Sequence, residues 1–225
     1  MGQNRRKNGR ALRNNCKTVK TLNADFDLKR RVAREAATLL YFGSEKEYKQ
    51  AKIKATETFG VHFLPSNVEV ALELDKIAEE NEGQKRKERL IQMRKEALEV
   101  MQLLRVFSPV LIGSVWRGTI RQESDIDIAV YADKTEEVLN TLKVGRAKIL
   151  KSAWTTINKH GTTFESFHIF AETNAKNELE IVVHSLGAAE KKRKCEIFGD
   201  ELKGLRIKEL DKILKTNPTQ QFIPE

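Results

Sequence analysis

Apolar positions in the first half of the chain recur at helical spacing between clear stop signals. Glycines at 43, 60 and 83 follow three of these runs, and glycine is common just past a helix end. Ser44–Glu47 and Ser66–Glu69 have the Ser-x-x-Glu spacing of a capping box, which predicts a helix start. The sequence therefore predicts helices over the ranges 28–41, 44–59, 66–80 and 84–107.

The second half mixes short β-branched and aromatic runs with helical patterns. The helix predicted at 84–107 leads directly into the first predicted strand, so this helix is expected to pack against the sheet. Strands are predicted at 109–112, 125–131, 164–171 and 179–184, with a crossover helix at 135–144 and two helical patterns in 188–215 split by Gly199. The expected fold is α+β, a small mixed sheet backed by helices, with an N-terminal helical domain.

Two carboxylates stand out in the second predicted strand. Asp125 and Asp127 flank one isoleucine, and side chains two apart on a strand face the same way, roughly 6 to 7 Å apart. Two like charges at that spacing repel unless a cation lies between them. Hard divalent ions such as Mg²⁺ take oxygen ligands and suit this arrangement, so the pair predicts a metal site.

The end of the preceding strand carries a Gly-Ser pair. Gly113 permits a tight turn, and the following backbone N–H groups and the Ser114 hydroxyl can bind an anion. Arg117 lies three residues later, where one helical turn returns its guanidinium toward the same anion. The pattern predicts a phosphate-binding turn next to the carboxylates.

Gly113-Ser114, Arg117-Gly118-Thr119 and Ser124-Asp125-Ile126-Asp127 together resemble the signature of the DNA polymerase beta-like nucleotidyltransferase superfamily. The form is similar to archaeal CCA-adding enzymes and to the minimal nucleotidyltransferases of toxin–antitoxin pairs. The resemblance implies a third acidic metal ligand on a neighbouring strand, and Glu180, between apolar residues, is the predicted one, with Glu172 a weaker candidate.

The resemblance also implies the chemistry. Two Mg²⁺ ions, with Mn²⁺ as an alternative, would be held by Asp125, Asp127 and Glu180. Gly113, Ser114 and Arg117 would bind the phosphates of a nucleoside triphosphate, which donates its nucleoside monophosphate to an acceptor hydroxyl. His168 and His184 are interpreted as packing or hydrogen-bonding residues.

Charge and cysteine content bear on the acceptor and the location. The net charge is +9, and the first 24 residues hold seven basic side chains and no acid, so the rest carries +2. This basic tail either contacts RNA phosphates or only aids solubility. Only Cys16 and Cys195 are present, far apart, which argues against a zinc site or a disulfide framework. Without a long apolar run, a cytoplasmic protein and no membrane partner are expected.

The sequence leaves the acceptor open. RNA is the favoured acceptor; the alternatives are a protein, as in antitoxins that adenylylate a toxin, or a catalytically silent module that binds RNA or a partner. The expected parts are a disordered basic tail (1–24), a helical domain (25–83), a catalytic domain (84–187) and a C-terminal helical segment (188–225).

Overall fold

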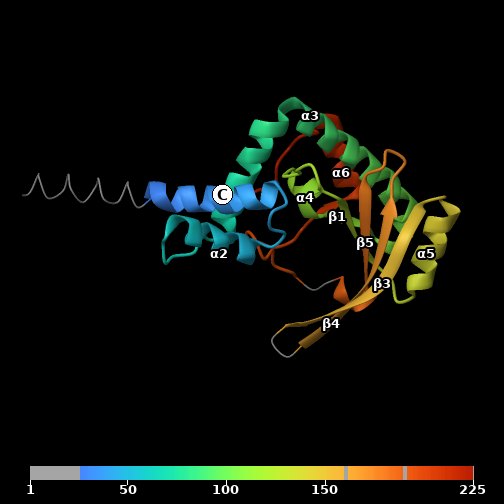
Figure 1. Cartoon of the computed structure of the whole chain (residues 1–225). Helices are drawn as coiled ribbons and strands as arrows, with labels where there is room; N and C mark the ends of the chain where they lie inside the picture. Colours follow the sequence, from blue (N-terminus) through green and yellow to red (C-terminus); the bar gives the residue numbers. More distant parts are fainter. Residues whose placement is uncertain (1–25, 160–161, 190–191, 225) are drawn as a thin grey trace, which may run out of the picture. The chain divides into compact units, whose positions relative to one another are not determined.

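The computed structural model describes residues 26–159, 162–189 and 192–224 (Figure 1). The basic tail lies outside the described residues. The chain divides into two compact units, one up to Ile77 and one from Ala78 onward, and each is described by itself. The four-part division stays a prediction.

The first unit is helical, as predicted. It contains a helix over 26–41, α2 (Tyr48–Phe59) and the beginning of α3 (Asn67–Leu103). The capping box predicted at Ser44 is wrong, because α2 begins at Tyr48 and its N-cap residue, Glu47, makes no side-chain cap hydrogen bond. The box at Ser66 is confirmed: Ser66 N donates to Glu69 Oε2 (2.7 Å) and Glu69 N donates to Ser66 Oγ (3.2 Å).

Helix α3 is kinked at a position within the second unit. Gly83 has φ 50° and ψ −126°, a conformation outside the helical region that glycine adopts readily and that divides α3 into two helical segments. The break predicted at Gly83 is therefore confirmed. The second segment ends in a 3₁₀ turn, η1 (Arg105–Phe107), which leads into the sheet.

The second unit is built on one mixed sheet, which confirms the predicted fold class. The strand order is β3-β4-β5-β2-β1-β6; β2 and β5 are parallel and the other neighbouring pairs are antiparallel. Its elements are β1 (Val110–Ile112), α4 (Gly113–Arg117), β2 (Ile126–Tyr131), α5 (Thr135–Val144), β3 (Lys148–Lys159), β4 (Thr162–Glu172), β5 (Glu178–His184), η2 (Leu186–Ala188), β6 (Leu205–Arg206) and α6 (Ile207–Thr216).

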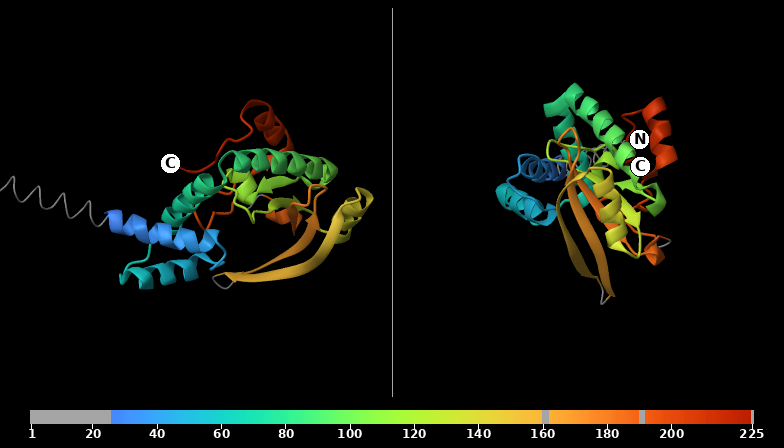
Figure 2. Two further views of the ribbon diagram at one scale, coloured as in Figure 1. Left: turned by 45° about the horizontal axis from the view of Figure 1, so that its top comes forward. Right: turned by 90° about the vertical axis from the view of Figure 1, so that its right-hand side faces the viewer.

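Two parts of the second unit differ from the sequence expectation. Strand β3 had not been predicted; with β4 it forms a long curved hairpin that extends beyond the rest of the sheet (Figure 2). The helix predicted before Gly199 is wrong over the described residues. There the chain makes a β-bridge between Lys194 and Glu201, and Cys195 N donates to the carbonyl of Asp200 (2.8 Å).

The two faces of the sheet differ in polarity. On one face, fully buried side chains of the central strands pack with those of α3 and α5: Ile126, Ile128, Val130, Leu179, Ile181, Val183, Met93, Ala97, Met101, Val138 and Leu142. Because side chains alternate along a strand, the intervening residues lie on the opposite face, which carries polar groups. None of the described helices has the length and apolarity of a membrane span.

Candidate functional site

The three predicted acidic residues lie together at one end of the two parallel strands. Asp125 directly precedes β2, Asp127 is its second residue, and the parallel register pairs Asp127 with Glu180 of β5. One carboxylate oxygen from each residue can be chosen so that all lie within 4.8 Å of one another. The side chains are half-buried, so they form a compact oxygen cluster with access to solvent.

The cluster is electrostatically costly without a cation. Burial, together with the nearby charges of Asp125 and Glu180, raises the pKa of Asp127 to about 8. Burial also raises the pKa of Asp125, an effect reinforced by Glu180 and opposed by the positive charge of Arg121. An all-oxygen donor set with uncompensated negative charge fits a hard divalent ion such as Mg²⁺.

Gly113 brings the Gly-Ser turn into contact with this cluster. Its φ of +70° lies in the left-handed region, and a Cβ at this position would overlap the Asp127 carboxylate. Position 113 therefore excludes side chains for two separate reasons. The half-buried hydroxyl of Ser114, the next residue, has no hydrogen-bond partner among the described residues, so it is available to a ligand.

Glu180 is held in place by a histidine on the adjacent strand. His168 Nδ1 lies 2.6 Å from Glu180 Oε1, and His168 Nε2 lies 2.8 Å from Ser166 Oγ. An imidazole fixed at both nitrogens restricts the rotation of the carboxylate it contacts. The pattern of residues could not show this pairing, because it depends on the register between β4 and β5.

Arg117 is not brought together with the acidic side chains. It is buried (5% exposed), and its guanidinium binds Asp200 Oδ1 (2.6 Å) and the Phe222 carbonyl (2.8 Å). It also lies over the rings of Trp116 and Phe198. These contacts attach α4 to the C-terminal segment, so a role in phosphate binding has no support from its surroundings.

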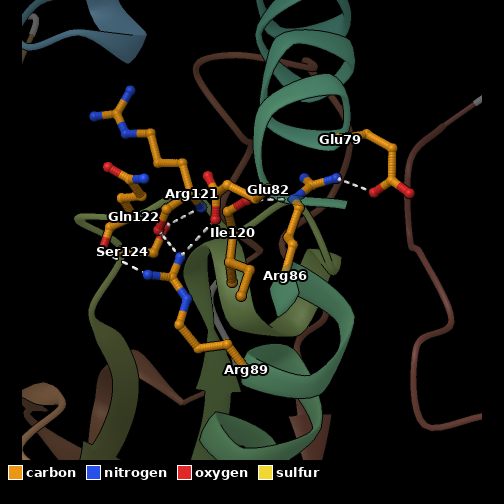
Figure 3. Close-up of polar contacts among 8 residues, drawn as sticks. All are labelled: Glu79, Glu82, Arg86, Arg89, Ile120, Arg121, Gln122 and Ser124. Carbon is orange, nitrogen blue, oxygen red and sulfur yellow. Dashed lines mark hydrogen bonds and ion pairs between the residues drawn. The ribbon is translucent and has the colours of Figure 1, made fainter. Parts of the chain in front are cut away.

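Two arginines of α3 hold the loop that leads to Asp125, a feature that the sequence did not indicate (Figure 3). Arg86 Nε donates to the carbonyl of Ile120 (2.7 Å). Arg89 donates to the carbonyls of Gln122 (2.6 Å) and of Arg121. The acids Glu79 and Glu82, which lie before the kink at Gly83, pair with these arginines at 3.2 and 3.5 Å.

Within the loop, the Ser124 hydroxyl accepts a hydrogen bond from Arg121 N (2.9 Å). Ser124 N in turn donates to the Arg121 carbonyl (2.9 Å). The approach to the first acid is thus fixed from the helix side by Arg86 and Arg89 and within the loop by Ser124.

Comparison with known proteins agrees with this geometry. Residues 91–218, more than half of the chain, match the model of the nucleotidyltransferase domain family. The chain therefore belongs to this family, and the recognition made from the Gly-Ser and Asp-Ile-Asp motif is confirmed. The match begins on α3 and includes the whole sheet.

Several solved structures are similar to parts of this chain at low identity. A cytoplasmic RNA terminal U-transferase is 14% identical, with a TM-score of 0.30, over 52% of this chain and 34% of its own. The Cid1 poly(U) polymerase with bound MgGTP is 16% identical, with a TM-score of 0.30, over 49% of this chain and 38% of its own. The chain thus spans less than two fifths of the length of these proteins. No curated protein matched the chain significantly.

Proposed function

We propose that this protein transfers a nucleoside monophosphate from a nucleoside triphosphate to a hydroxyl group of RNA, with Mg²⁺, and releases pyrophosphate. The observation that carries the proposal is the oxygen cluster of Asp125, Asp127 and Glu180 beside the turn at Gly113. Family membership supports the reaction class, and the donor set supports the metal.

Each acid has a distinct part in the proposal. Asp125 and Asp127 would bind two Mg²⁺ ions, with Mn²⁺ as an alternative, and Glu180 would complete the ligand set nearer the acceptor. His168 keeps the Glu180 carboxylate aimed at the cluster. When bound, such ions lower the pKa of a coordinated hydroxyl and neutralise charge on the phosphates.

The Gly-Ser turn binds the two phosphates that leave as pyrophosphate. The backbone at Gly113 and the Ser114 hydroxyl donate hydrogen bonds to the β- and γ-phosphates. The acceptor oxygen forms a bond to the α-phosphorus while the bond from the α-phosphorus to the bridging oxygen of the β-phosphate breaks. The hydroxyl proton leaves to solvent, and pyrophosphate carries away the electron pair.

The choice of RNA as acceptor rests on charge. The net charge of +9 and the seven basic residues of the N-terminal tail favour a polyanionic partner. A protein acceptor gains nothing from this charge, so it is an outcome of the test below and not a second proposal.

The test is transfer of label from α-³²P-labelled nucleoside triphosphates, with Mg²⁺ or Mn²⁺, to total RNA or to cell protein. Label in RNA that depends on the acids is expected. Glu180→Gln should abolish it, whereas Glu172→Gln should not, because Glu172, the last residue of β4, is bound to Lys148 of β3 (2.9 Å). Label in protein alone would redirect the proposal to the other acceptor, and no label in either fraction would overturn it.

A further inference from the structure

A second polar group lies on the acidic face of the sheet, at the other end of the parallel strands. Arg193 Nη1 lies 2.7 Å from His184 Nε2 at the end of β5, and its Nη2 lies 3.5 Å from Tyr131 Oη at the end of β2. The rings of Tyr131 and His184 are 5.9 Å apart. All three side chains are half-buried, so the guanidinium is oriented and still reachable.

Within the part of the chain that the structure describes, no acidic side chain pairs with Arg193. Other arginines of this unit pair with acids, as Arg117 does with Asp200 (2.6 Å) and Arg86 with Glu79 (3.2 Å). Among the described residues, the side-chain partners of Arg193 are only an imidazole and a phenol. Of its five N–H donors, most are therefore left for a ligand.

Burial keeps the imidazole uncharged. Burial and the positive charge of Arg193 together lower the pKa of His184 to about 4, so at neutral pH the ring is neutral and its Nε2 accepts the hydrogen bond. A neutral acceptor fixes the direction of the guanidinium without cancelling its charge. A fixed guanidinium with free donors is well suited to phosphate.

The distance of Arg193 from the three acids determines whether it can reach the nucleotide triphosphate or another phosphate. Tyr131 pairs with His184 as Asp127 pairs with Glu180, on the same face and four residues further along the strands. Four strand residues span roughly 13 Å. The triphosphate is proposed to extend from the acids toward the turn at Gly113, on the β1 side, and so away from Arg193.

We infer that Arg193, oriented by His184 and assisted by the Tyr131 hydroxyl, binds a backbone phosphate of the acceptor nucleic acid a few nucleotides from the reacting end. This subsite rests on the proposed function, because it assigns the acceptor of that same site. It gives the catalytic unit a contact with RNA that is independent of the N-terminal tail.

The test is binding, so it reads out even if no transfer is detected. The full chain is titrated, without nucleotide, into a short fluorescein-labelled RNA oligonucleotide over a range of KCl concentrations. Arg193→Gln removes the charge and keeps hydrogen-bonding capacity, Arg193→Lys keeps the charge, and Lys192→Gln is the matched control. Lys192 is the neighbouring cation, with a side chain that is 80% exposed and paired with Glu201. ATP affinity is measured in parallel with Mg²⁺.

For Arg193→Gln, we expect the slope of log affinity against log salt to become shallower by about 0.7, the value of one phosphate contact on a single strand. Arg193→Lys should recover most of that slope, Lys192→Gln should leave it nearly unchanged, and ATP affinity should stay the same. Tyr131→Phe, which removes only the hydroxyl, should weaken binding less and covers the case in which Arg193→Gln does not fold.

Three results would overturn the inference. One is no RNA binding by the wild-type chain, and a second is an equal loss in Arg193→Gln and Lys192→Gln, which would mean unspecific attraction. The third is a loss of ATP affinity with RNA binding intact, which would assign the subsite to the triphosphate.

Discussion

Two clusters of charged residues in the second unit differ in whether their charges have partners of the opposite kind. At the acidic end of β2 and β5, three carboxylates share a small volume, and their proximity helps to raise the pKa of Asp125 and of Asp127. In the arginine cluster, formed by Arg94, Arg117 and the C-terminal segment, the guanidinium groups donate to backbone carbonyls and to the Asp200 carboxylate. Arg94 is fully buried and donates to the carbonyls of Val115, Trp116, Pro218 and Gln220.

This difference distinguishes charged groups that can bind a ligand from charged groups that stabilise the fold. Buried charge with complete partners stabilises one arrangement of the chain, whereas buried charge left without partners is poised for a ligand. Arg117 belongs to the recognised motif but lies in the complete cluster, with Asp200 and the Phe222 carbonyl as partners. Membership of a motif therefore does not decide whether a residue meets substrate.

The largest expected effect is on the acidic side of this comparison. Asp127→Asn keeps the shape of the side chain and removes a metal ligand, so the rate of nucleotide transfer should fall by about 10³-fold or more. The same substitution should raise the melting temperature of the metal-free protein at pH 8, because it removes repulsion with Asp125 and Glu180. Rates and melting curves on one preparation check both signs, and a gain of stability without loss of activity would contradict the assignment.

Arg94→Met, in the arginine cluster, should lower the stability of the protein, whereas Asp127→Asn should raise it. Arg94→Met leaves four backbone carbonyls without their donor, which should lower the free energy of unfolding by about 3 kcal/mol. Chemical denaturation measures this loss. Lys95→Met, at an exposed position on the same helix, is the control and should change stability little.

His168 tests whether the orientation of Glu180 matters for catalysis. His168→Phe removes both contacts of the imidazole, and we expect a 10- to 100-fold loss of activity together with a higher Mg²⁺ concentration for half-maximal rate. His168→Asn keeps a donor near Glu180 and should lose less. His62→Asn, at an exposed position of the first unit, controls for the loss of a histidine. An unchanged Mg²⁺ requirement in His168→Phe would show that the histidine only packs.

The smallest effect expected is the pH dependence of stability. Asp127 has a pKa of about 8 in the folded chain and about 4 when unfolded, so the folded state binds the extra proton between these values. The metal-free protein should therefore lose stability as pH rises from about 4 to about 8, by several degrees relative to Asp127→Asn. Added Mg²⁺ should stabilise the wild-type chain more at pH 8 than at pH 5, because it binds the deprotonated carboxylate. If stability fell equally with pH in the wild-type chain and in Asp127→Asn, titration of Asp127 would not be the cause.

Features encoded by neighbouring residues were predictable from the sequence. The bounds predicted for α5, Thr135–Val144, agree with the structure, because its apolar spacing and the following Gly145 are local signals. The same is true of the Gly-Ser turn and the paired aspartates. The break at Gly83 also follows from one residue type at one position.

Features that depend on pairing between distant segments were not predictable. Strand β3 has largely exposed side chains over its described part, including Trp154 at 63% exposure, and its alternation is weak; it is a strand because it pairs with β4. The contact of His168 with Glu180 follows from the register of β4 against β5. The partners of Arg117 lie 83 and 105 residues further along the chain, where no periodicity reports them.

The pairing of Asp127 with Glu180 across two parallel strands makes the metal-binding set depend on the register in which these strands fold. Side chains alternate, so a slip of β5 by one residue would point Glu180 into the apolar layer and turn Ile181 outward. A molecule misaligned in this way would lack the third carboxylate and bind metal weakly. A divalent ion would then stabilise the correctly aligned chain, so the metal proposed for catalysis would also favour the native register of β5.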